Sequence, residues 1–350
     1  MKIGYSFWGF LGNGITDTPD GGRSHRRPMI DALLGRGHEI VFLQANRDLI
    51  EAGDDLGNAY TFHSGSPDID VLFLEWRWAI DGRNTTPCDT EGHTCDLHRQ
   101  AELITRYTVR RKTPTVIWDK DRRLRPDSVW RRVRQTTVCE AALEPTPGAH
   151  RLLFPVDDRL LAEADPIVLA KKPRDLVLAY LGNQYDRDKH FDRFFAPSAA
   201  RFDHLVGGKW TKTGRWPNVR FLGRLPFEAV NSVYGRSLAT VLMLPDRYAA
   251  VGQMTQRIFE AVLAGCLPLA PADILHVDRF VPKELIVSSG GEVIERLSHL
   301  QRIAGTQQHA DLIAACLDRL DLFRLSRQVD ALDALLDAAA NTVAVERGAA

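Results

Sequence analysis

The stretch Asn218–Ala270 constrains the fold more than any other part of the sequence. Three short apolar runs within it have the length and composition of buried strands: Val219–Leu222, Leu238–Leu244 and Cys266–Leu269. Helical spacing fills the intervals, first at 226–234 and then at 255–264, where Gly265 ends the pattern. This alternation of strands and helices predicts half of a parallel, doubly wound sheet.

The loop Pro245–Gln253 and the helix that follows it are predicted to lie on the ligand side of that sheet. Doubly wound sheets bind ligands at the carboxyl ends of their strands, and free N–H groups at a helix start favour an anion. Arg257 offers a fork for phosphate oxygens, and Glu260, one turn later, can accept hydrogen bonds from a diol. The pair indicates a nucleotide, although a surface ion pair between them is the alternative.

Two segments, FLGRLP and RIFEAVLAGCLPLA, with Tyr234 between them, resemble the carboxyl-terminal domain of GT-B glycosyltransferases. The run Tyr180–Arg187 resembles the segment that opens the donor domain of that family. The resemblance implies that Glu260 holds the ribose of a nucleotide-sugar donor, a UDP-sugar such as UDP-glucose, and that transfer retains configuration. Many retaining members carry a further glutamate where this chain has Gly252, and Gln253 is the candidate substitute.

We expect the donor to be bound from loops and from the start of the helix 255–264. The predicted donor-binding residues are Gly12, Asn13, Gly182, Arg187, Lys209, Arg224, Gln253, Gln256, Arg257 and Glu260. Glycines after a first strand allow close backbone approach to a ligand, although their spacing here is not the dinucleotide fingerprint. Because cationic side chains and helix N-termini can stabilise a departing diphosphate, we expect neither a metal nor another cofactor.

The length of 350 residues suits two domains of ordinary size, and 44% hydrophobic with 26% charged residues is typical of globular proteins. We expect an α/β protein of two doubly wound, Rossmann-like domains facing a cleft, the GT-B architecture. Residues 1–160 would form the acceptor side and 175–325 the donor side. The helix at 326–350 is implied by the resemblance to cross back to the first domain, and Pro155–Arg174 is predicted to be the linker.

Targeting signals are not apparent in the sequence. The longest apolar runs fall short of a membrane span, and the amino terminus enters a strand without a cleavable apolar segment. Five cysteines, an odd number in a long chain, argue against a disulfide framework. We therefore expect a cytoplasmic protein that does not insert into membranes.

Three polar residues are the predicted catalytic groups: Asp119 and Glu75 at strand ends, and His25 at the start of a helix. Asp119 follows the strand Pro114–Trp118 and is placed for proton transfer, or for a salt-bridged loop. Glu75 follows a buried strand and precedes two tryptophans. His25 lies in a basic first helical turn, which has the wrong charge for the helix dipole and needs an anion nearby, unless water solvates its arginines.

The acceptor side is predicted from aromatic and basic residues, namely Trp76, Trp78, Arg122, Arg123 and Arg125. The stretch Arg110–Arg134 holds 10 Lys/Arg against 3 Asp/Glu, which fits a phosphate backbone and an extruded base. A solvated basic helix at Pro126–Arg134 is the alternative. The run SFWGFLGNGITDTPDGGRSHRR is similar to glycosyltransferases carried by bacteriophages of actinobacteria, some of whose relatives are thought to decorate DNA bases, so DNA is the expected acceptor.

One compact loop contains four residue types that bind metals: Cys88, His93, Cys95 and His98. Structural zinc sites usually separate two ligand pairs by about a dozen residues, so this spacing predicts no metal. Other functions stay open at this point. They are a nucleotide-sugar epimerase of the same fold, a transferase with a small-molecule or protein acceptor, and a non-catalytic nucleic-acid-binding protein, against which the zero net charge counts.

Overall fold

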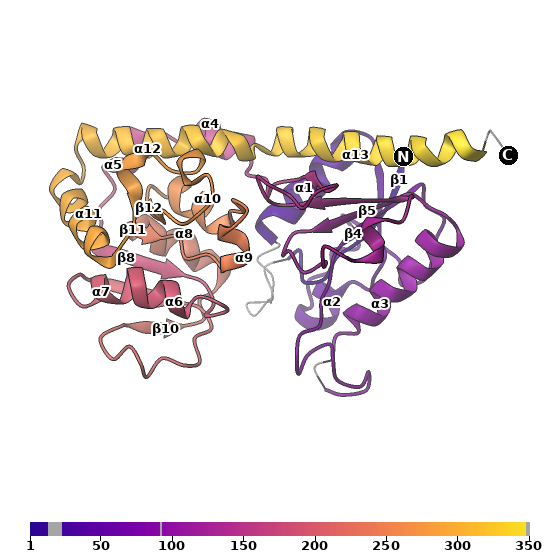
Figure 1. Cartoon of the computed structure of the whole chain (residues 1–350), viewed down its shortest axis with the longest axis horizontal. Coiled ribbons are helices and arrows are strands. Elements are labelled where there is room, and N and C mark those ends of the chain that lie inside the picture. Colours follow the sequence, from indigo (N-terminus) through magenta and orange to yellow (C-terminus); the bar gives the residue numbers. More distant parts are fainter. Residues whose placement is uncertain (13–22, 92, 348–350) are drawn as a thin grey trace. The chain divides into compact units, whose positions relative to one another are not determined.

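The computed structural model describes residues 1–12, 23–91 and 93–347 (Figure 1). The chain divides into two compact units: Met1–Leu153 with Arg327–Ala350 form unit 1, and Phe154–Ser326 form unit 2. Each unit contains one parallel sheet with helices packed against it. The predicted α/β class with two doubly wound halves is therefore confirmed.

Unit 1 is built on a seven-stranded sheet within the described residues, with strand order β3-β2-β1-β4-β5-β6-β7. Its strands are β1 (Lys2–Ser6), β2 (Glu39–Phe42), β3 (Thr61–Phe62), β4 (Val71–Glu75), β5 (Thr115–Asp119), β6 (Thr136–Glu140) and β7 (His150–Arg151). Every residue of β4 and β5 is buried, as expected for parallel strands covered on both faces. The helices are α1 (Arg23–Gly35), α2 (Arg47–Ala52), α3 (Asp96–Leu103) and a π-helical continuation, Ile104–Arg110.

Unit 2 repeats the same topology with a six-stranded sheet in the order β10-β9-β8-β11-β12-β13. Its strands are β8 (Leu176–Leu181), β9 (His204–Gly207), β10 (Phe221–Gly223), β11 (Ser237–Val241), β12 (Leu267–Pro271) and β13 (Ile286–Val287). The longer helices are α8 (Phe227–Arg236), α10 (Gln256–Leu263), α11 (Gly290–Ile303) and α12 (Gln307–Leu320), and the short ones include α6 (Asp188–His190), α7 (Ala196–Ala199) and α9 (Asp246–Ala249). In both sheets the strand order reverses at the first strand of the unit, which creates a topological switch point.

Helix α10 follows from its sequence pattern. Ile258, Phe259 and Val262 are buried on one face, as their spacing predicts. Gly265 then takes a φ of +80°, a left-handed conformation that ends helices and that glycine adopts without strain. The chain turns directly into β12, so the polar start of α10 stays at the carboxyl edge of the sheet.

The predicted linker Pro155–Arg174 is wrong, because this segment is folded into unit 2. It contains α4 (Asp158–Glu163) and α5 (Pro166–Ala170), and α5 packs against α12. Arg174 donates hydrogen bonds to the carbonyls of Gly235 and Ser237 at 2.8 and 2.9 Å, which holds the segment against α8 and β11. Capping by Asp157 and Asp165 stabilises helices that the three prolines seemed to exclude.

The predicted basic helix at Pro126–Arg134 is also wrong. Only a single 3₁₀ turn forms there, at Val129–Arg131. The segment lacks an apolar stripe that a sheet could bury, and most helical stability in proteins comes from such packing. Its shape is instead set by side-chain contacts, since Arg131 donates to the carbonyls of Arg125 and Leu124 at 3.0 and 2.9 Å.

The last helix, α13 (Leu325–Arg347), starts in unit 2 and belongs to unit 1 from Arg327 onward (Figure 1). Within unit 1, Arg36 at the end of α1 pairs with Asp330 and Asp333 at 2.5 and 2.7 Å. His38 also contacts Asp333, at 2.7 Å. These contacts fasten the chain terminus to the unit that contains β1. Across the described residues, no helix combines the length and apolar character needed to cross a bilayer.

Candidate functional site

The switch point of unit 2 lies between the carboxyl ends of β8 and β11, and the loops there are held closely together. The amide of Gly182 donates to the carbonyl of Gly207 at 2.8 Å, and the amide of Gln184 donates to the carbonyl of Lys209 at 3.0 Å. Gly208 has a φ of +130°, and a Cβ there would collide with the Gly182 carbonyl. Glycine is therefore required at 208 for this close approach of two loops.

Arg257, in the first turn of α10, lies directly over Gly182. Its Nε donates to the carbonyl of Leu181 at 2.5 Å, and its guanidinium carbon is 5.6 Å from the ring centre of Tyr180. A Cβ on Gly182 would lie 2.5 Å from one guanidinium nitrogen and 2.6 Å from the guanidinium carbon. The absence of a side chain at 182 thus makes room for the guanidinium at the switch point.

Glu260 follows Arg257 by three residues and is half-buried. Throughout the part of the chain that the structure describes, Glu260 has no hydrogen-bond or ion-pair partner, Arg257 included. Burial raises the pKa of Glu260, and the charge of Arg257 opposes that rise. The predicted alternative, a surface ion pair between the two, is not formed, which leaves a carboxylate whose acceptor positions are not used by the protein.

Two buried tyrosines line the same region, and sequence reasoning did not assign them a role. Within the described residues, the hydroxyls of Tyr180 and Tyr234 have no hydrogen-bond partner. Burial, and then the nearby Glu260 carboxylate, raises the pKa of Tyr234 well above its usual value, so this phenol is a neutral donor. Buried hydroxyls normally find a partner, so these two are unsatisfied polar groups beneath Arg257 and Glu260.

The start of α10 is also open to an anion. Its N-cap residue, Thr255, makes no side-chain hydrogen bond to the helix, so the first amides lack the usual cap. Gln256 at the first helical position is half-buried, and Gln253 just before the helix is fully buried. Helix amides beside Arg257 provide a site for phosphate oxygens.

The structure gives other predicted donor residues different positions. Arg187 is buried and braces the loop after β8, because its guanidinium donates to the carbonyls of Met243, Asn183 and Tyr185 at 3.0, 3.2 and 2.6 Å. Burial lowers the pKa of Arg187. Lys209 and Arg224 are exposed. Arg187 therefore shapes the loops of the site, and the direct donor contact predicted for it stays a prediction.

Gly12 and Asn13 were predicted to approach the donor from unit 1. The amide of Gly12 instead donates to Asp48 at 2.8 Å, and the amide of Leu11 donates to the second oxygen of the same carboxylate at 3.1 Å. Gly12 is buried, so its N–H is used within the protein. Asn13 lies outside the described residues.

Glu75, a predicted catalytic residue, lies in a buried ionic cluster at the switch point of unit 1. Arg26 binds it with two nitrogens at 2.8 and 2.7 Å, Lys120 contacts it at 2.7 Å, and the Tyr5 hydroxyl donates to it at 2.5 Å. Although burial acts to raise the pKa of Glu75, Arg26 and Lys120 outweigh it and hold that pKa well below the usual range. Glu75 is fully buried, so it has no surface with which to contact a substrate, and the catalytic prediction is corrected to a structural one.

The same cluster explains the basic first turn of α1. Arg26 is fully buried, and the anion that this turn requires is Glu75, a residue 49 positions away. His25 is also buried, with its ring edge-to-face against Trp118 at 5.4 Å. The sequence contained the signal for a compensating anion but could not name it, since the partner lies on a strand distant in sequence.

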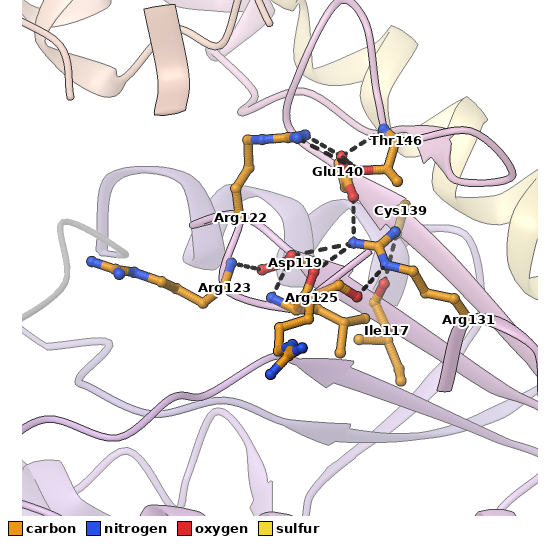
Figure 2. Close-up of polar contacts among 10 residues, drawn as sticks. Ile117, Asp119, Arg122, Arg123, Arg125, Arg131, Cys139, Glu140 and Thr146 are labelled. Carbon is orange, nitrogen blue, oxygen red and sulfur yellow. Dashed lines mark hydrogen bonds and ion pairs between the residues drawn. The ribbon is translucent and has the colours of Figure 1, made fainter. Parts of the chain in front are cut away.

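Asp119 at the end of β5 belongs to a second polar network, drawn in Figure 2. Its carboxylate accepts from the amides of Arg123 and Leu124, both at 2.8 Å, and Arg131 lies 3.7 Å away. Burial raises the pKa of Asp119 to about 6. The salt-bridged loop weighed for this residue is thus present, and each carboxylate oxygen accepts one backbone amide.

The predicted acceptor arginines differ in their surroundings. Arg122 pairs with the buried Glu140, which Arg131 and Thr146 also contact (Figure 2). Arg125 is exposed and pairs with Asp127 at 2.9 and 2.8 Å. Arg122 is therefore committed to an internal carboxylate, which contradicts its predicted role on an acceptor surface.

The predicted aromatic residues are half-buried. Trp76 packs against the core of unit 1. Trp78 lies edge-to-face with Trp8 at 5.4 Å, and the guanidinium of Arg123 is 5.8 Å from the Trp78 ring. Of the predicted acceptor residues, Trp78 and Arg123 thus form one contact.

A separate cavity in unit 2 lies away from these loops. Its lining includes Val177, Asp203, His204 and Arg220. These residues lie at the amino ends of β8 and β9 and just before β10. Because doubly wound sheets bind ligands at the opposite edge, this cavity is not the candidate site.

Comparisons with known proteins bear on the family and the fold. Residues 187–321 match a protein family described as glycosyl transferase-like, and this match includes Arg257 and Glu260. A search of curated proteins returned no match.

Three solved structures show the similarity of fold. BGT of T4 phage, in complex with its UDP-glucose substrate, is 14% identical with a TM-score of 0.66 and covers 96% of this chain and 100% of its own. An alpha-glucosyltransferase bound to UDP-glucose and to DNA containing an abasic site is 10% identical with a TM-score of 0.62, covering 95% and 98%. AviGT4, a glycosyltransferase involved in avilamycin A biosynthesis, is 12% identical with a TM-score of 0.59, covering 97% and 98%. The resemblance predicted from the sequence is confirmed: the chain has the GT-B fold, and residues 187–321 match the glycosyl transferase-like family model.

Proposed function

We propose that this protein is a glycosyltransferase that takes a sugar from a UDP-glucose-type donor bound in unit 2. The observation that carries the proposal is the unpaired Glu260 one turn after Arg257, at the switch point of the sheet. The glycosyl transferase-like match and the UDP-glucose bound by two structural neighbours support it.

The residues suit the parts of a sugar nucleotide. Arg257 and the uncapped amides of α10 would bind the diphosphate, whose negative charge grows as the sugar leaves. Glu260 would accept hydrogen bonds from the two ribose hydroxyls. Gly182 and Gly208 leave the space in which these groups approach the ligand.

Calorimetry with UDP-glucose and with UDP tests the donor site. Glu260→Gln removes the charge but preserves the shape, and Arg257→Ala removes the guanidinium. Losing a hydrogen bond to a charged group costs about 1.5–3 kcal/mol, so affinity should fall roughly 10- to 100-fold in each variant. Glu295→Gln, an exposed change of the same charge on α11, is the matched control. Unchanged affinity in both site variants, with normal folding, would remove the donor site from this part of unit 2.

We propose that transfer proceeds with retention and without a divalent metal, since Arg257 and the helix amides supply positive charge at the diphosphate. A beta-glucosyltransferase and an alpha-glucosyltransferase are both structural neighbours. The fold is therefore compatible with either product configuration, and the stereochemistry needs its own measurement. Proton NMR of the first product formed reports its anomeric configuration. A rate of donor turnover that stays constant in EDTA supports the metal-free reaction, and a rate restored only by added Mn²⁺ or Mg²⁺ argues against it.

For the acceptor we propose a hydroxyl group on a modified base in DNA. Support comes from the DNA-bound structural neighbour and from exposed arginines such as Arg106 and Arg110 on the helix after α3. Mass spectrometry of DNA that contains hydroxymethylated bases, incubated with enzyme and UDP-glucose, should show added hexose. Donor hydrolysis without DNA modification would instead indicate a small-molecule or protein acceptor, whereas an isomerised UDP-sugar would identify an epimerase.

A further inference from the structure

A loop of unit 1 between β4 and α3 brings together four side chains with metal-binding atoms. They are Cys88, His93, Cys95 and His98. One ligand atom from each residue can be chosen so that all four lie within 4.8 Å of one another. Their spacing in the sequence argued against such a cluster, because no two pairs are separated by the usual dozen residues. The fold of the loop brings Cys88 close to His98, so the wide spacing of the usual zinc pattern is not needed to gather the four side chains.

We propose that Cys88, His93, Cys95 and His98 form a structural zinc site. Two thiolates and two neutral imidazoles make a donor set that zinc prefers, and the charge of two thiolates matches that of Zn²⁺. Four protein ligands complete a tetrahedral shell and leave no position for water or substrate, so the site stabilises structure and performs no chemistry. The proposal is independent of the donor site in unit 2.

The observed separations suit a tetrahedral ion. With Zn–S of about 2.3 Å and Zn–N of about 2.0–2.1 Å, tetrahedral ligand atoms lie roughly 3.3–3.8 Å apart. The Cys88 sulfur and Nδ1 of His98 are 2.9 Å apart, and the rings of His93 and His98 have centres 5.6 Å apart. Side-chain rotations that move the ligand atoms by about 1 Å therefore convert this cluster into a zinc shell.

His93 has the arrangement expected of a zinc ligand that is held by a second residue. Its Nδ1 is 3.2 Å from the hydroxyl oxygen of Thr86. Its Nε2 is buried and, within the described residues, has no hydrogen-bond partner. If Nδ1–H donates to Thr86, Nε2 presents its lone pair to the cluster, which is how outer contacts fix the tautomer of metal-binding histidines. A buried ring nitrogen without a partner is costly, and a metal bond removes that cost.

The backbone places the other ligands at the start of α3. Cys95 is the N-cap residue, with a φ of 50°, and makes no side-chain hydrogen bond to the helix. His98 lies three residues later, so the two side chains share one face of the first turn. The thiol of Cys95 is therefore directed by an uncommon backbone conformation, and not used as a helix cap.

The loop itself has few other means of stabilisation. Residues 85–91 are largely exposed and form no helix or strand. Asn84 is buried and bonds to the carbonyl of Trp78 and the amide of Ile80, but it holds only the beginning of the loop. Long loops without regular structure are uncommon in compact domains unless something orders them. A zinc ion would cross-link the end of this loop to α3.

The direct test measures metal in the full-length protein purified without chelators from zinc-supplemented cells. Inductively coupled plasma mass spectrometry should detect one zinc ion per chain. Replacing zinc with Co²⁺ should give the intense visible absorption of tetrahedral cobalt with sulfur-to-metal charge transfer. Both readings use the wild-type protein, so they do not depend on whether a variant folds, and neither depends on enzymatic activity.

Variants then assign the ligands. Cys95→Ser and His93→Ala should each lower zinc affinity at least tenfold and lower the melting temperature, and added zinc should raise the melting temperature of the wild type only. Asp89→Asn and Glu91→Gln, which alter exposed carboxylates of the same loop, should retain full zinc. The proposal is overturned if reduced wild-type protein binds neither zinc nor cobalt. It is equally overturned if peptide mapping shows a Cys88–Cys95 disulfide that persists in cells, or if zinc content is unchanged in Cys95→Ser.

Discussion

Replacing Gly182 by alanine perturbs the candidate donor site without changing any charged group. The added Cβ would lie 2.5 Å from one guanidinium nitrogen of Arg257 and 2.6 Å from its central carbon. Favourable contacts between such atoms occur at about 3.5–4.0 Å, so the guanidinium must move by roughly 1 Å. That shift also breaks its 2.5 Å hydrogen bond to the Leu181 carbonyl.

The cost should appear in ligand binding, with some loss of stability from the broken contact between Arg257 and the Leu181 carbonyl. Gly182 does not have a positive φ, so alanine fits its backbone, and the atoms it meets are the end of a flexible side chain. A misplacement of about 1 Å in a positioning group can reduce the rate about 100-fold, and losing one charged hydrogen bond costs about 1.5–3 kcal/mol. We therefore expect UDP affinity to fall about 10- to 100-fold, while the protein stays folded.

Isothermal titration calorimetry with UDP is the assay, and Gly214→Ala is the matched control. Gly214 is exposed in the same unit, and a Cβ there meets no atom within 4 Å. The control should bind UDP like the wild type. If folded Gly182→Ala binds UDP with unchanged affinity, the guanidinium of Arg257 does not hold the diphosphate, and the reasoning from the switch point fails.

Three other predictions concern residues of unit 1. Arg122→Gln should lower the free energy of unfolding by about 1–3 kcal/mol in urea denaturation, because it removes a partner of the buried Glu140, and a change within 0.5 kcal/mol would refute that role. Arg110→Gln should leave stability unchanged but should reduce the salt dependence of DNA affinity by the equivalent of about one phosphate contact, as measured by electrophoretic titrations. An unchanged salt dependence would mean that Arg110 does not contact DNA. The pKa of Asp119 is raised to about 6 from 3.8, so the folded state binds the extra proton between these values. Stability from this group is therefore present below about pH 4 and lost by about pH 6, up to about 3 kcal/mol relative to Asp119→Asn, and parallel pH profiles of unfolding would contradict it.

The sequence predicted those features that depend on local pattern. The spacing of Ile258, Phe259 and Val262 defines α10, and Gly265 ends it. Once that helix follows a buried strand, the sheet geometry places Arg257 at the ligand edge. The alternation of such units along the chain then predicts two parallel sheets, which the structure contains.

Features that depend on distant partners could not be predicted from local pattern. Glu75 looked catalytic because it follows a strand, but Arg26 and Lys120 enclose it from two other elements. Arg122 looked available for DNA because the sequence around it is basic, yet its partner Glu140 ends a neighbouring strand. Charge counted along a sequence does not show which charges are already neutralised in the fold.

The prolines of 155–174 show a different limit. They suggested an open linker, whereas Asp165 caps α5 and Pro166 begins it, a position where proline is well tolerated. The cluster of Cys88, His93, Cys95 and His98 shows a similar limit, since only the turn of the loop brings Cys88 to His98. In both cases the deciding contact is set by three-dimensional folding and not by spacing.

The measurement that tests the central claim most directly follows UDP-glucose by proton NMR during incubation with the pure protein, without any acceptor. We predict that the wild type slowly releases free glucose and UDP, because water replaces the acceptor. Glu260→Gln should release them much more slowly. If the wild type neither binds nor turns over UDP-glucose or any other nucleotide sugar, or if Glu260→Gln releases glucose at the wild-type rate, unit 2 does not hold a sugar donor through Glu260.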